Sequence, residues 1–311
     1  MLIQEKYRGR LEAGMLDYIQ QLGEPPGDGH QESIAEQRQR YSERCAAFGA
    51  PRAAGVDTQD ETLPGAGGPI PIRVYATAAA QHGCVLYMHG GGWVVGDLDS
   101  HDDICSEIAV QTGAQVVAID YRRVPEHTYP AAFDDCCAVL DYLRDNPARF
   151  GTRLVVAGDS AGGNLAAALA LHVRDVHAAP LAGQVLVYPL LCVDQSLPAY
   201  TELHDAPLFT RAEATRVVAD YLGIQAADAY AAPLLAGDFA GLAPVYACVA
   251  EIDPLRDDGV AYVQKLQAAG TPAELFVARG LTHAFLRARH ISTGAGAAFS
   301  GITHAIKEFV R

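Results

Sequence analysis

Short apolar runs alternate with helix-favouring stretches along most of the chain. The apolar runs lie at 84–89, 115–120, 153–158, 184–189, 245–250 and 273–278. Each run is continuous and rich in Val, Leu and Ile, which is typical of strands buried on both faces of a parallel sheet. The helix-like stretches lie at 101–113, 131–147, 161–174, 257–269 and 295–310. This alternation predicts a doubly wound α/β sheet with helices on both sides.

Two regions depart from this rhythm. Residues 1–50 carry apolar positions at helical spacing, interrupted by a Gly- and Pro-rich turn at 23–29, and strand candidates follow at 56–63 and 70–75. Residues 190–243 are too many for a simple crossover and contain a helix-like stretch at 211–223. An insertion at the carboxyl ends of strands suits a lid over a site, so we expect it to pack with the N-terminal helices as a cap.

The expected organisation is therefore a core divided by its cap. It comprises an N-terminal cap segment at 1–50, a first core part at 51–189, a cap insertion at 190–243 and a second core part at 244–311. A chain of 311 residues, half of them hydrophobic, is long enough for one large α/β domain with an added subdomain.

Charge and cysteine content narrow the class of protein. The formal net charge of −14 disfavours binding to nucleic acids and anionic lipid surfaces. Seven scattered cysteines without C-x-x-C spacing indicate reduced thiols. The charged N-terminus lacks the apolar region of a signal peptide, and no run of about 18 apolar residues predicts a membrane span. We expect a cytoplasmic protein.

The strongest chemical signal is the sequence Gly-Asp-Ser-Ala-Gly at 158–162. It matches G-x-S-x-G, directly follows the apolar run at 153–158 and precedes a good helix former. This strand–turn–helix context presents a nucleophilic serine on a strained turn, and the helix N-terminus below it favours developing negative charge. Ser160 is the predicted nucleophile.

Three glycines follow the apolar run at 84–89, in the sequence His-Gly-Gly-Gly-Trp at 89–93. They suit a loop whose backbone N–H groups point at an oxyanion. We assign the donors to Gly91 and Gly92, with the amide of Ala161 as the third and Gly90 as an alternate. A phosphate loop is disfavoured because no Gly-Lys-Ser/Thr follows; a plain flexible turn is the other alternative.

The base and its orienting acid are expected after later strands, in the order nucleophile, acid, histidine. His283 follows the run at 273–278, whereas His290 and His304 lie further on and are weaker candidates. Asp253 and Glu251 both follow the run at 245–250. We prefer Asp253, next to a proline in a turn, with capping of the helix at 257–269 as its alternative role.

Other polar and aromatic residues have simpler interpretations. The sequence Ser100-His101-Asp102-Asp103 could indicate a metal site, but the start of a helix with Ser100 as N-cap explains it better. Asp257 and Asp258 fit the first turn of another helix. No metal site is predicted. Asp159 is a candidate for holding the oxyanion loop or shaping the pocket. The other candidates for a substrate pocket, each equally compatible with ordinary packing, are Trp93, Tyr188, Leu208, Phe209 and Phe285.

Five motifs occur in a recognisable order between about residues 84 and 286. They are HGGGW at 89–93, YRRVPEHTYPAAFDD at 121–135, GDSAGGNLA at 158–166, DPLRDDG at 253–259 and GLTHAF at 280–285. Together they resemble the hormone-sensitive-lipase family of bacterial carboxylesterases, in its GDSAG-type branch. Two departures are small: Ala284 stands where the family commonly has Gly, and Asp258 stands where Glu is usual.

The resemblance implies an α/β-hydrolase fold with a mostly parallel, eight-stranded sheet and a helical cap. It supports Ser160, Asp253 and His283 as the triad, and it implies short- to medium-chain ester substrates and no cofactor. Arg122 and Glu126 are expected to form ion pairs. Frequent dimerisation in the family makes a homodimer one candidate assembly.

The expected activity is hydrolysis of carboxylic esters. Two alternatives stay open on the sequence alone. An amidase or lactonase would use the same triad, because the pocket and not the triad determines which leaving group is accepted. A ligand-binding module on this scaffold would need a broken triad, whereas all three members are present here.

Overall fold

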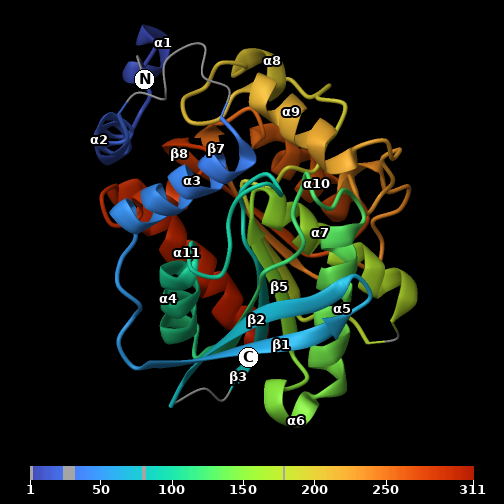
Figure 1. Cartoon of the computed structure of the whole chain (residues 1–311). Helices are drawn as coiled ribbons and strands as arrows, with labels where there is room; N and C mark the ends of the chain where they lie inside the picture. Colours follow the sequence, from blue (N-terminus) through green and yellow to red (C-terminus); the bar gives the residue numbers. More distant parts are fainter. Residues whose placement is uncertain (1–2, 24–31, 79–81, 178) are drawn as a thin grey trace.

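One eight-stranded sheet forms the centre of the protein, in the strand order β1-β2-β4-β3-β5-β6-β7-β8. The computed structural model describes residues 3–23, 32–78, 82–177 and 179–311 (Figure 1). β1 and β2 pair antiparallel, β2 and β4 pair antiparallel, and the remaining pairs are parallel. The predicted α/β hydrolase sheet is therefore confirmed.

All eight predicted strands are present, with small shifts at their ends. Their bounds are β1 Val56–Gly65, β2 Gly68–Thr77, β3 His82–Met88, β4 Ala114–Ile119, β5 Leu154–Asp159, β6 Gly183–Val187, β7 Val245–Ile252 and β8 Ala273–Thr282. β5 and β6 are buried along their whole length, because helices cover both faces of the sheet.

Helices cover the two faces of the sheet as two layers (Figure 1). On one face lie α5 (Ala131–Asp145), α7 (Ala161–Val176) and α10 (Arg256–Ala268), and on the other α4 (Asp102–Thr112) and α11 (Thr293–Val310). Two hydrophobic clusters match these layers: Leu165 and Leu169 pack with Leu86 on the first face, and Ile108 and Ile302 pack with Val85 on the second. Alternate residues of β3 thus face opposite cores.

The remaining helices come mainly from the N-terminal segment and the insertion. They are α1 Glu5–Arg8, α2 Ala13–Gln21, α3 Ile34–Phe48, α8 Ala199–Glu202, α9 Arg211–Leu222 and the short η1 Pro233–Leu235, whereas the short α6 Pro147–Phe150 and η2 Phe285–Ala288 lie elsewhere. Lys6 and the hydroxyl of Tyr7 both bind Asp205 of the insertion. Of the turn expected at 23–29, only residue 23 lies within the described residues. None of the helices in the described ranges is long and apolar enough to cross a membrane.

The first turn of α4 begins one residue later than predicted. The N-cap residue is His101, not Ser100. The Ser100 hydroxyl instead donates to the carbonyl of Asp97 and accepts from its amide, which closes a tight turn before the helix. Asp102 and Asp103 do lie in the first turn, where a negative charge interacts favourably with the helix dipole.

Asp258 has a larger structural role than the predicted place in a helical first turn. Its Oδ2 accepts hydrogen bonds from the amides of Leu191 and Cys192, at 2.7 and 2.8 Å, and from the hydroxyl of Tyr200 at 3.1 Å. The side chain is fully buried. Burial, with a smaller contribution from the charge of Asp253, holds the pKa of Asp258 well above its usual range. Asp258 thus fixes the start of the insertion to α10.

Replacing Asp258 tests this anchoring. In Asp258→Ala, two buried amides and one hydroxyl lose their acceptor, so the free energy of unfolding should fall by about 3 kcal/mol. Asp258→Asn keeps an acceptor oxygen and should lose about 1 kcal/mol or less. Urea unfolding followed by circular dichroism measures both values. Equal stability of Asp258→Ala and the wild type would contradict the anchoring role.

Candidate active site

The nucleophile candidate Ser160 lies on a tight turn between β5 and α7. Its φ of 55° and ψ of −117° place it in a conformation that non-glycine residues rarely adopt. The flanking glycines explain how the turn fits. A Cβ on Gly158 would lie 2.4 Å from the carbonyl oxygen of Gly162, and a Cβ on Gly162 would lie 1.9 Å from that of Met88. Both motif glycines are therefore required by close backbone contact.

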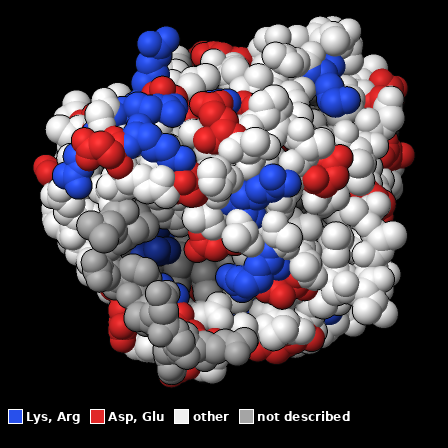
Figure 2. Space-filling model, turned by 90° about the horizontal axis from the view of Figure 1, so that it is seen from above, with Lys and Arg blue, Asp and Glu red and all other residues white. Residues whose placement is uncertain are grey.

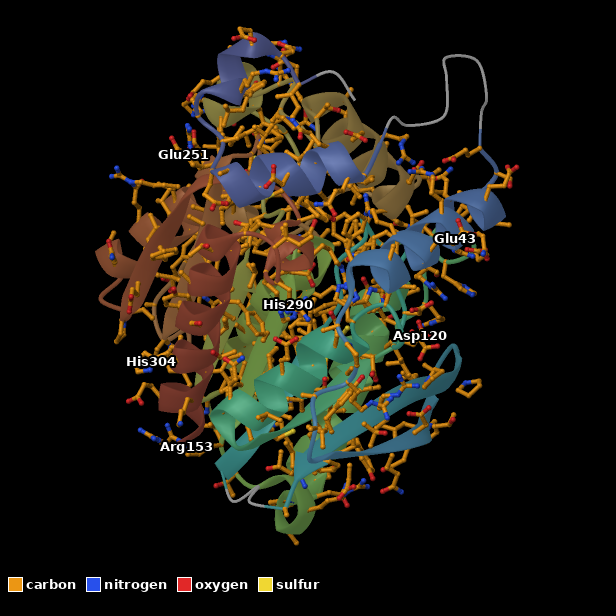
Figure 3. All side chains as sticks on the ribbon, turned by 90° about the vertical axis from the view of Figure 1, so that its left-hand side faces the viewer. Glu43, Asp120, Arg153, Glu251, His290 and His304 are labelled. Atoms are coloured by element: carbon orange, nitrogen blue, oxygen red, sulfur yellow. The ribbon has the colours of Figure 1, made fainter. Side chains whose placement is uncertain are left out.

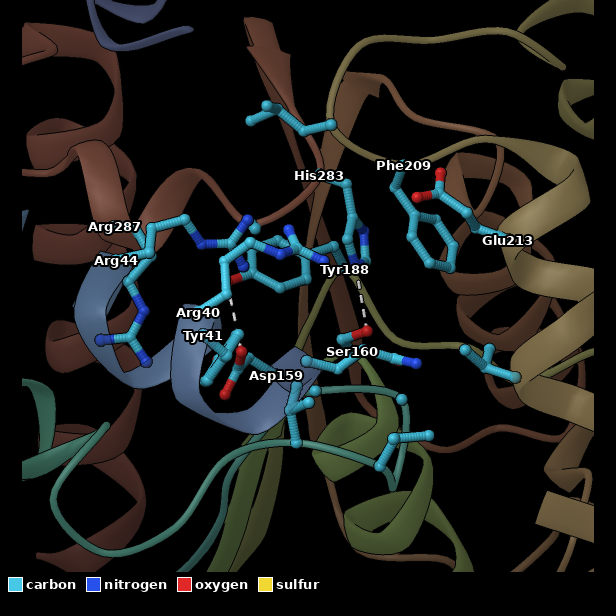
Figure 4. A pocket seen from close by; sticks show the side chains of 18 of the residues that line it. Arg40, Tyr41, Arg44, Asp159, Ser160, Tyr188, Phe209, Glu213, His283 and Arg287 are labelled. Carbon is cyan, nitrogen blue, oxygen red and sulfur yellow. Dashed lines mark hydrogen bonds between the residues drawn. The ribbon is translucent and has the colours of Figure 1, made fainter. Parts of the chain in front are cut away.

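Neighbouring strands deliver the other two polar groups to the same edge of the sheet. Asp253 directly follows β7, and His283 directly follows β8. His283 Nε2 lies 2.9 Å from Ser160 Oγ, and His283 Nδ1 lies 2.7 Å from Asp253 Oδ2 (Figure 4). Asp253 is fully buried, and its Oδ1 accepts a hydrogen bond from the Leu255 amide at 2.9 Å.

The weaker candidates for base and acid lie elsewhere. His290 Nε2 bonds to Glu107, and His304 is exposed on α11. Glu251 accepts from the Gly280 amide and faces Arg10 instead of His283. Across the described ranges, His283 is the one histidine with a ring nitrogen within hydrogen-bond distance of Ser160 Oγ. The structure thus brings together the three residues expected from the sequence, and the three weaker candidates are labelled in Figure 3.

The glycine loop after β3 lies beside the serine. Gly91 and Gly92 have positive φ values of 123° and 61°, and both line the same cavity as Ser160. Within the described chain, their amides and the amide of Ala161 bond to no protein acceptor. The Gly90 amide, in contrast, donates to Asp159 Oδ1 at 3.0 Å. This leaves Gly91, Gly92 and Ala161 better suited than Gly90 to bind an oxyanion.

Asp159 joins the glycine loop to the serine turn. Besides the Gly90 amide, its Oδ1 accepts from the Tyr87 hydroxyl at 2.9 Å and lies 3.3 Å from His101 Nε2. Burial works against ionisation, but the neighbouring His101 and Arg287 outweigh it and hold the pKa of Asp159 below its usual value. An ionised Asp159 is therefore a fixed acceptor that positions the glycine loop relative to Ser160.

A cavity of about 190 Å³ opens onto Ser160 and His283. Four of the six predicted pocket residues lie on its wall: Asp159, Tyr188, Leu208 and Phe209. The Phe209 ring stacks on the His283 ring, with centroids 4.4 Å apart.

Trp93 and Phe285 do not lie on the wall and have the ordinary packing role that the sequence left open. Trp93 is buried and stacks on Tyr221 of α9, with ring centroids 3.9 Å apart. Phe285 is buried behind Tyr188, with ring centroids 4.9 Å apart. Both aromatic side chains support the cavity from the layer behind its surface.

Much of the wall comes from cap residues that the sequence prediction missed. They are Tyr18 of α2, Gln37, Arg40, Tyr41 and Arg44 of α3, and Glu213, Arg216 and Val217 of α9. Arg287 of η2 also contributes. One signal was available, because residues 37, 40, 41 and 44 recur at helical spacing and share one face of α3. That face is polar, and polar faces usually meet solvent.

The ion pairs predicted for Arg122 and Glu126 are present. Arg122 Nη2 lies 2.8 Å from Asp135 Oδ1, and both carboxylate oxygens of Glu126 bind the guanidinium of Arg38. The second pair ties α3 to the segment that follows β4.

Comparison with known proteins places the chain among enzymes of one fold. Residues 85–287 match the family described as alpha/beta hydrolase fold. "Esterase LipI" of Mycobacterium tuberculosis is 42% identical over 237 residues, which cover 73% of this chain and 74% of the relative. "Ethyl acetate hydrolase" of Pseudomonas putida is 38% identical over 235 residues, covering 70% and 72%.

Solved structures agree over nearly the whole chain. "Bacterial Heroin Esterase" superposes with a TM-score of 0.88 at 29% identity, covering 97% of this chain and 99% of that chain. The esterase of Pyrobaculum calidifontis superposes with a TM-score of 0.84 at 31% identity, covering 94% and 98%. With the sheet order, the serine turn and the matched residues, these likenesses confirm the resemblance: the chain belongs to the α/β hydrolase fold family, in its hormone-sensitive-lipase branch.

Proposed function

We propose that this protein is a serine carboxylesterase acting on small ester substrates, with Ser160 as nucleophile, His283 as general base and Asp253 as the acid that orients the base. The observation that carries the proposal is the hydrogen-bonded row from Ser160 Oγ through the His283 ring to Asp253. The printed names of the relatives, which include esterase, carboxylesterase and ethyl acetate hydrolase, support ester hydrolysis.

In the acylation half-reaction, Ser160 Oγ attacks the ester carbonyl carbon while His283 Nε2 takes the hydroxyl proton. The negative charge that develops on the carbonyl oxygen is stabilised by hydrogen bonds that the N–H groups of Gly91, Gly92 and Ala161 donate. When the tetrahedral intermediate collapses, the C–O bond to the alcohol breaks. His283 gives its proton to the departing alcohol oxygen, and the acyl group stays esterified to Ser160.

Deacylation repeats the sequence with water as the nucleophile. His283 removes a proton from the water while the water oxygen attacks the acyl carbon. The bond between the acyl carbon and Ser160 Oγ then breaks, and Oγ regains a proton from His283. Throughout, the buried carboxylate of Asp253 keeps the Nδ1 proton of His283 in place and stabilises the charged imidazolium that forms twice per turnover.

The small volume of the cavity should limit acyl-chain length. Residues of α3 and α9 line the cavity together with Ser160, and the cavity volume is about 190 Å³. Across p-nitrophenyl esters from acetate to dodecanoate, we expect kcat/KM to reach its maximum at short or medium chains and to fall with longer ones, which must displace the cap. A maximum at the longest chains would favour a lipase instead.

Assembly and location stay predictions. A homodimer is tested by light scattering during size-exclusion chromatography of the purified chain, where a monomer mass at micromolar concentration would count against it. A cytoplasmic location is tested by fractionating the source cells.

A further inference from the structure

The active-site cavity is basic although the protein as a whole is acidic. The formal net charge of the chain is −14. Yet four arginines line the cavity against two acidic residues. The arginines are Arg40, Arg44, Arg216 and Arg287, and the acids are Asp159 and Glu213. Seen from above, basic side chains lie inside the hollow of this face (Figure 2). Such a local surplus of arginine calls for a specific explanation.

Two of the four arginines are neutralised within the cap. Arg40 forms a bidentate pair with Glu32, with N–O distances of 2.8 and 2.5 Å, and Arg216 lies 3.2 Å from Asp220. Glu213 is engaged in the capping box of α9. These side chains therefore offer little free charge to a ligand.

Arg287 is buried and incompletely satisfied. It is 4% exposed, and its Nη2 contacts His101 Nε2 at 2.9 Å. Its Nη1 lies 3.6 Å from Asp103 Oδ1 and has no hydrogen-bond partner. Asp103 is held more closely by Arg289, at 2.5 Å. A guanidinium N–H group this deeply buried is costly unless another group accepts a hydrogen bond from it.

Arg44 is the second unsatisfied cation. Its Nε is buried without a partner, and no carboxylate pairs with it in the described part of the chain. The guanidinium carbon of Arg44 lies 5.1 Å from the centre of the Tyr41 ring, and that of Arg287 lies 6.0 Å from the same ring. Figure 4 shows Arg44, Tyr41 and Arg287 on the side of Ser160 opposite Phe209 and Glu213.

We propose that Arg44 and Arg287 form a carboxylate-binding subsite, so that the preferred substrates are esters bearing a second, ionised carboxylate. A planar carboxylate matches guanidinium geometry and would accept hydrogen bonds from the unsatisfied N–H groups beside Tyr41. Phe209 faces Ser160 from the other wall, which leaves that side for an apolar part of the substrate. The inference rests on the proposed esterase function and adds a substrate class to it.

Matched ester pairs test the subsite on either side of the scissile bond. Monoethyl glutarate and ethyl pentanoate differ only in whether the acyl chain ends in a carboxylate or a methyl group. 4-Acetoxybutanoate and butyl acetate make the same comparison in the alcohol part. With the full-length protein and pH-stat detection, we expect the wild type to favour at least one anionic ester over its neutral match by about tenfold in kcat/KM.

Substitutions at Arg44 test whether this preference depends on the subsite. Arg44→Met should remove most of it, mainly by raising KM for the anionic ester, and Arg44→Lys should restore part of it because a cation returns. Arg216→Met is the matched control: it removes a positive charge from the same cavity wall, but one already paired with Asp220. It should leave the preference within about twofold of the wild type. Pentanoate should also inhibit the wild type at lower concentration than its uncharged amide, pentanamide, a readout that needs no variant.

Three results would overturn the subsite. These are equal kcat/KM for both members of each pair in the wild type, a preference that survives in Arg44→Met, or an equal loss in Arg216→Met. None of them touches the proposed esterase function, which would instead be contradicted if the wild type hydrolysed none of the four esters.

Discussion

Ser160→Ala should reduce kcat for p-nitrophenyl ester hydrolysis by about a millionfold, the largest effect expected of any single substitution. The variant lacks the oxygen that forms the acyl-enzyme, whereas His283 and the amides of the glycine loop stay in place. Because the alanine methyl group occupies space already filled by the serine Cβ, the fold should be unaffected. Steady-state rates at matched protein concentration, with circular dichroism of both proteins, make the comparison.

Covalent labelling provides the control for this experiment. A fluorophosphonate probe should modify the wild type at Ser160, as located by peptide mass spectrometry, and leave Ser160→Ala unmodified. Turnover by a folded Ser160→Ala protein within a hundredfold of the wild type would remove the assignment. Labelling at another serine in the wild type would do the same.

Asp253→Asn should lower kcat by about ten-thousandfold without disturbing the structure. The Leu255 amide requires an acceptor oxygen at one position of residue 253. The asparagine must therefore turn its oxygen towards Leu255 and its NH2 group towards His283. That NH2 group can only donate, so His283 would carry its proton on Nε2 and could not accept the proton of Ser160.

Glu251→Gln is the matched control for Asp253→Asn. It makes the same chemical change two residues earlier, on a carboxylate that binds the Gly280 amide and lies near Arg10. Its kcat should stay within about threefold of the wild type, as for a substitution outside the reacting groups. Comparable losses in the two variants would show that residue 253 has no special relation to the histidine.

The features predicted well from the sequence are those set by local rules. A run such as 153–158 has the length and β-branched content of a buried strand, and the glycines at 158 and 162 are required by contacts within one turn. His283 and Asp253 were found because each directly follows a strand, and parallel strands end at one edge of a sheet. Their approach to Ser160 follows from that shared edge, so no packing between cap and core had to be predicted.

The features that were missed depend on packing between distant segments. Arg44 lies on a polar helix face that would usually meet solvent, yet it lines the cavity of a serine more than a hundred residues away. Trp93 follows the glycine loop but turns onto Tyr221, a contact that only the docking of α9 creates. Asp258 does lie in the first turn of α10, but nothing near it in sequence reveals that it also binds the amides of Leu191 and Cys192. The periodicity of apolar residues identifies a helix or strand, but it does not show which other segment packs against it.

The cavity wall and the reacting groups come from different parts of the chain. Ser160, Asp253 and His283 follow core strands, whereas α3 and α9 supply seven of the residues that line the cavity. Many of the residues that would select a substrate therefore lie in other stretches of sequence than the reacting groups, with Arg287, close to His283, as an exception. Exchange of α3 and α9 between relatives, by evolution or by protein engineering, could therefore change which substrates bind. The residues that break the ester bond would stay the same.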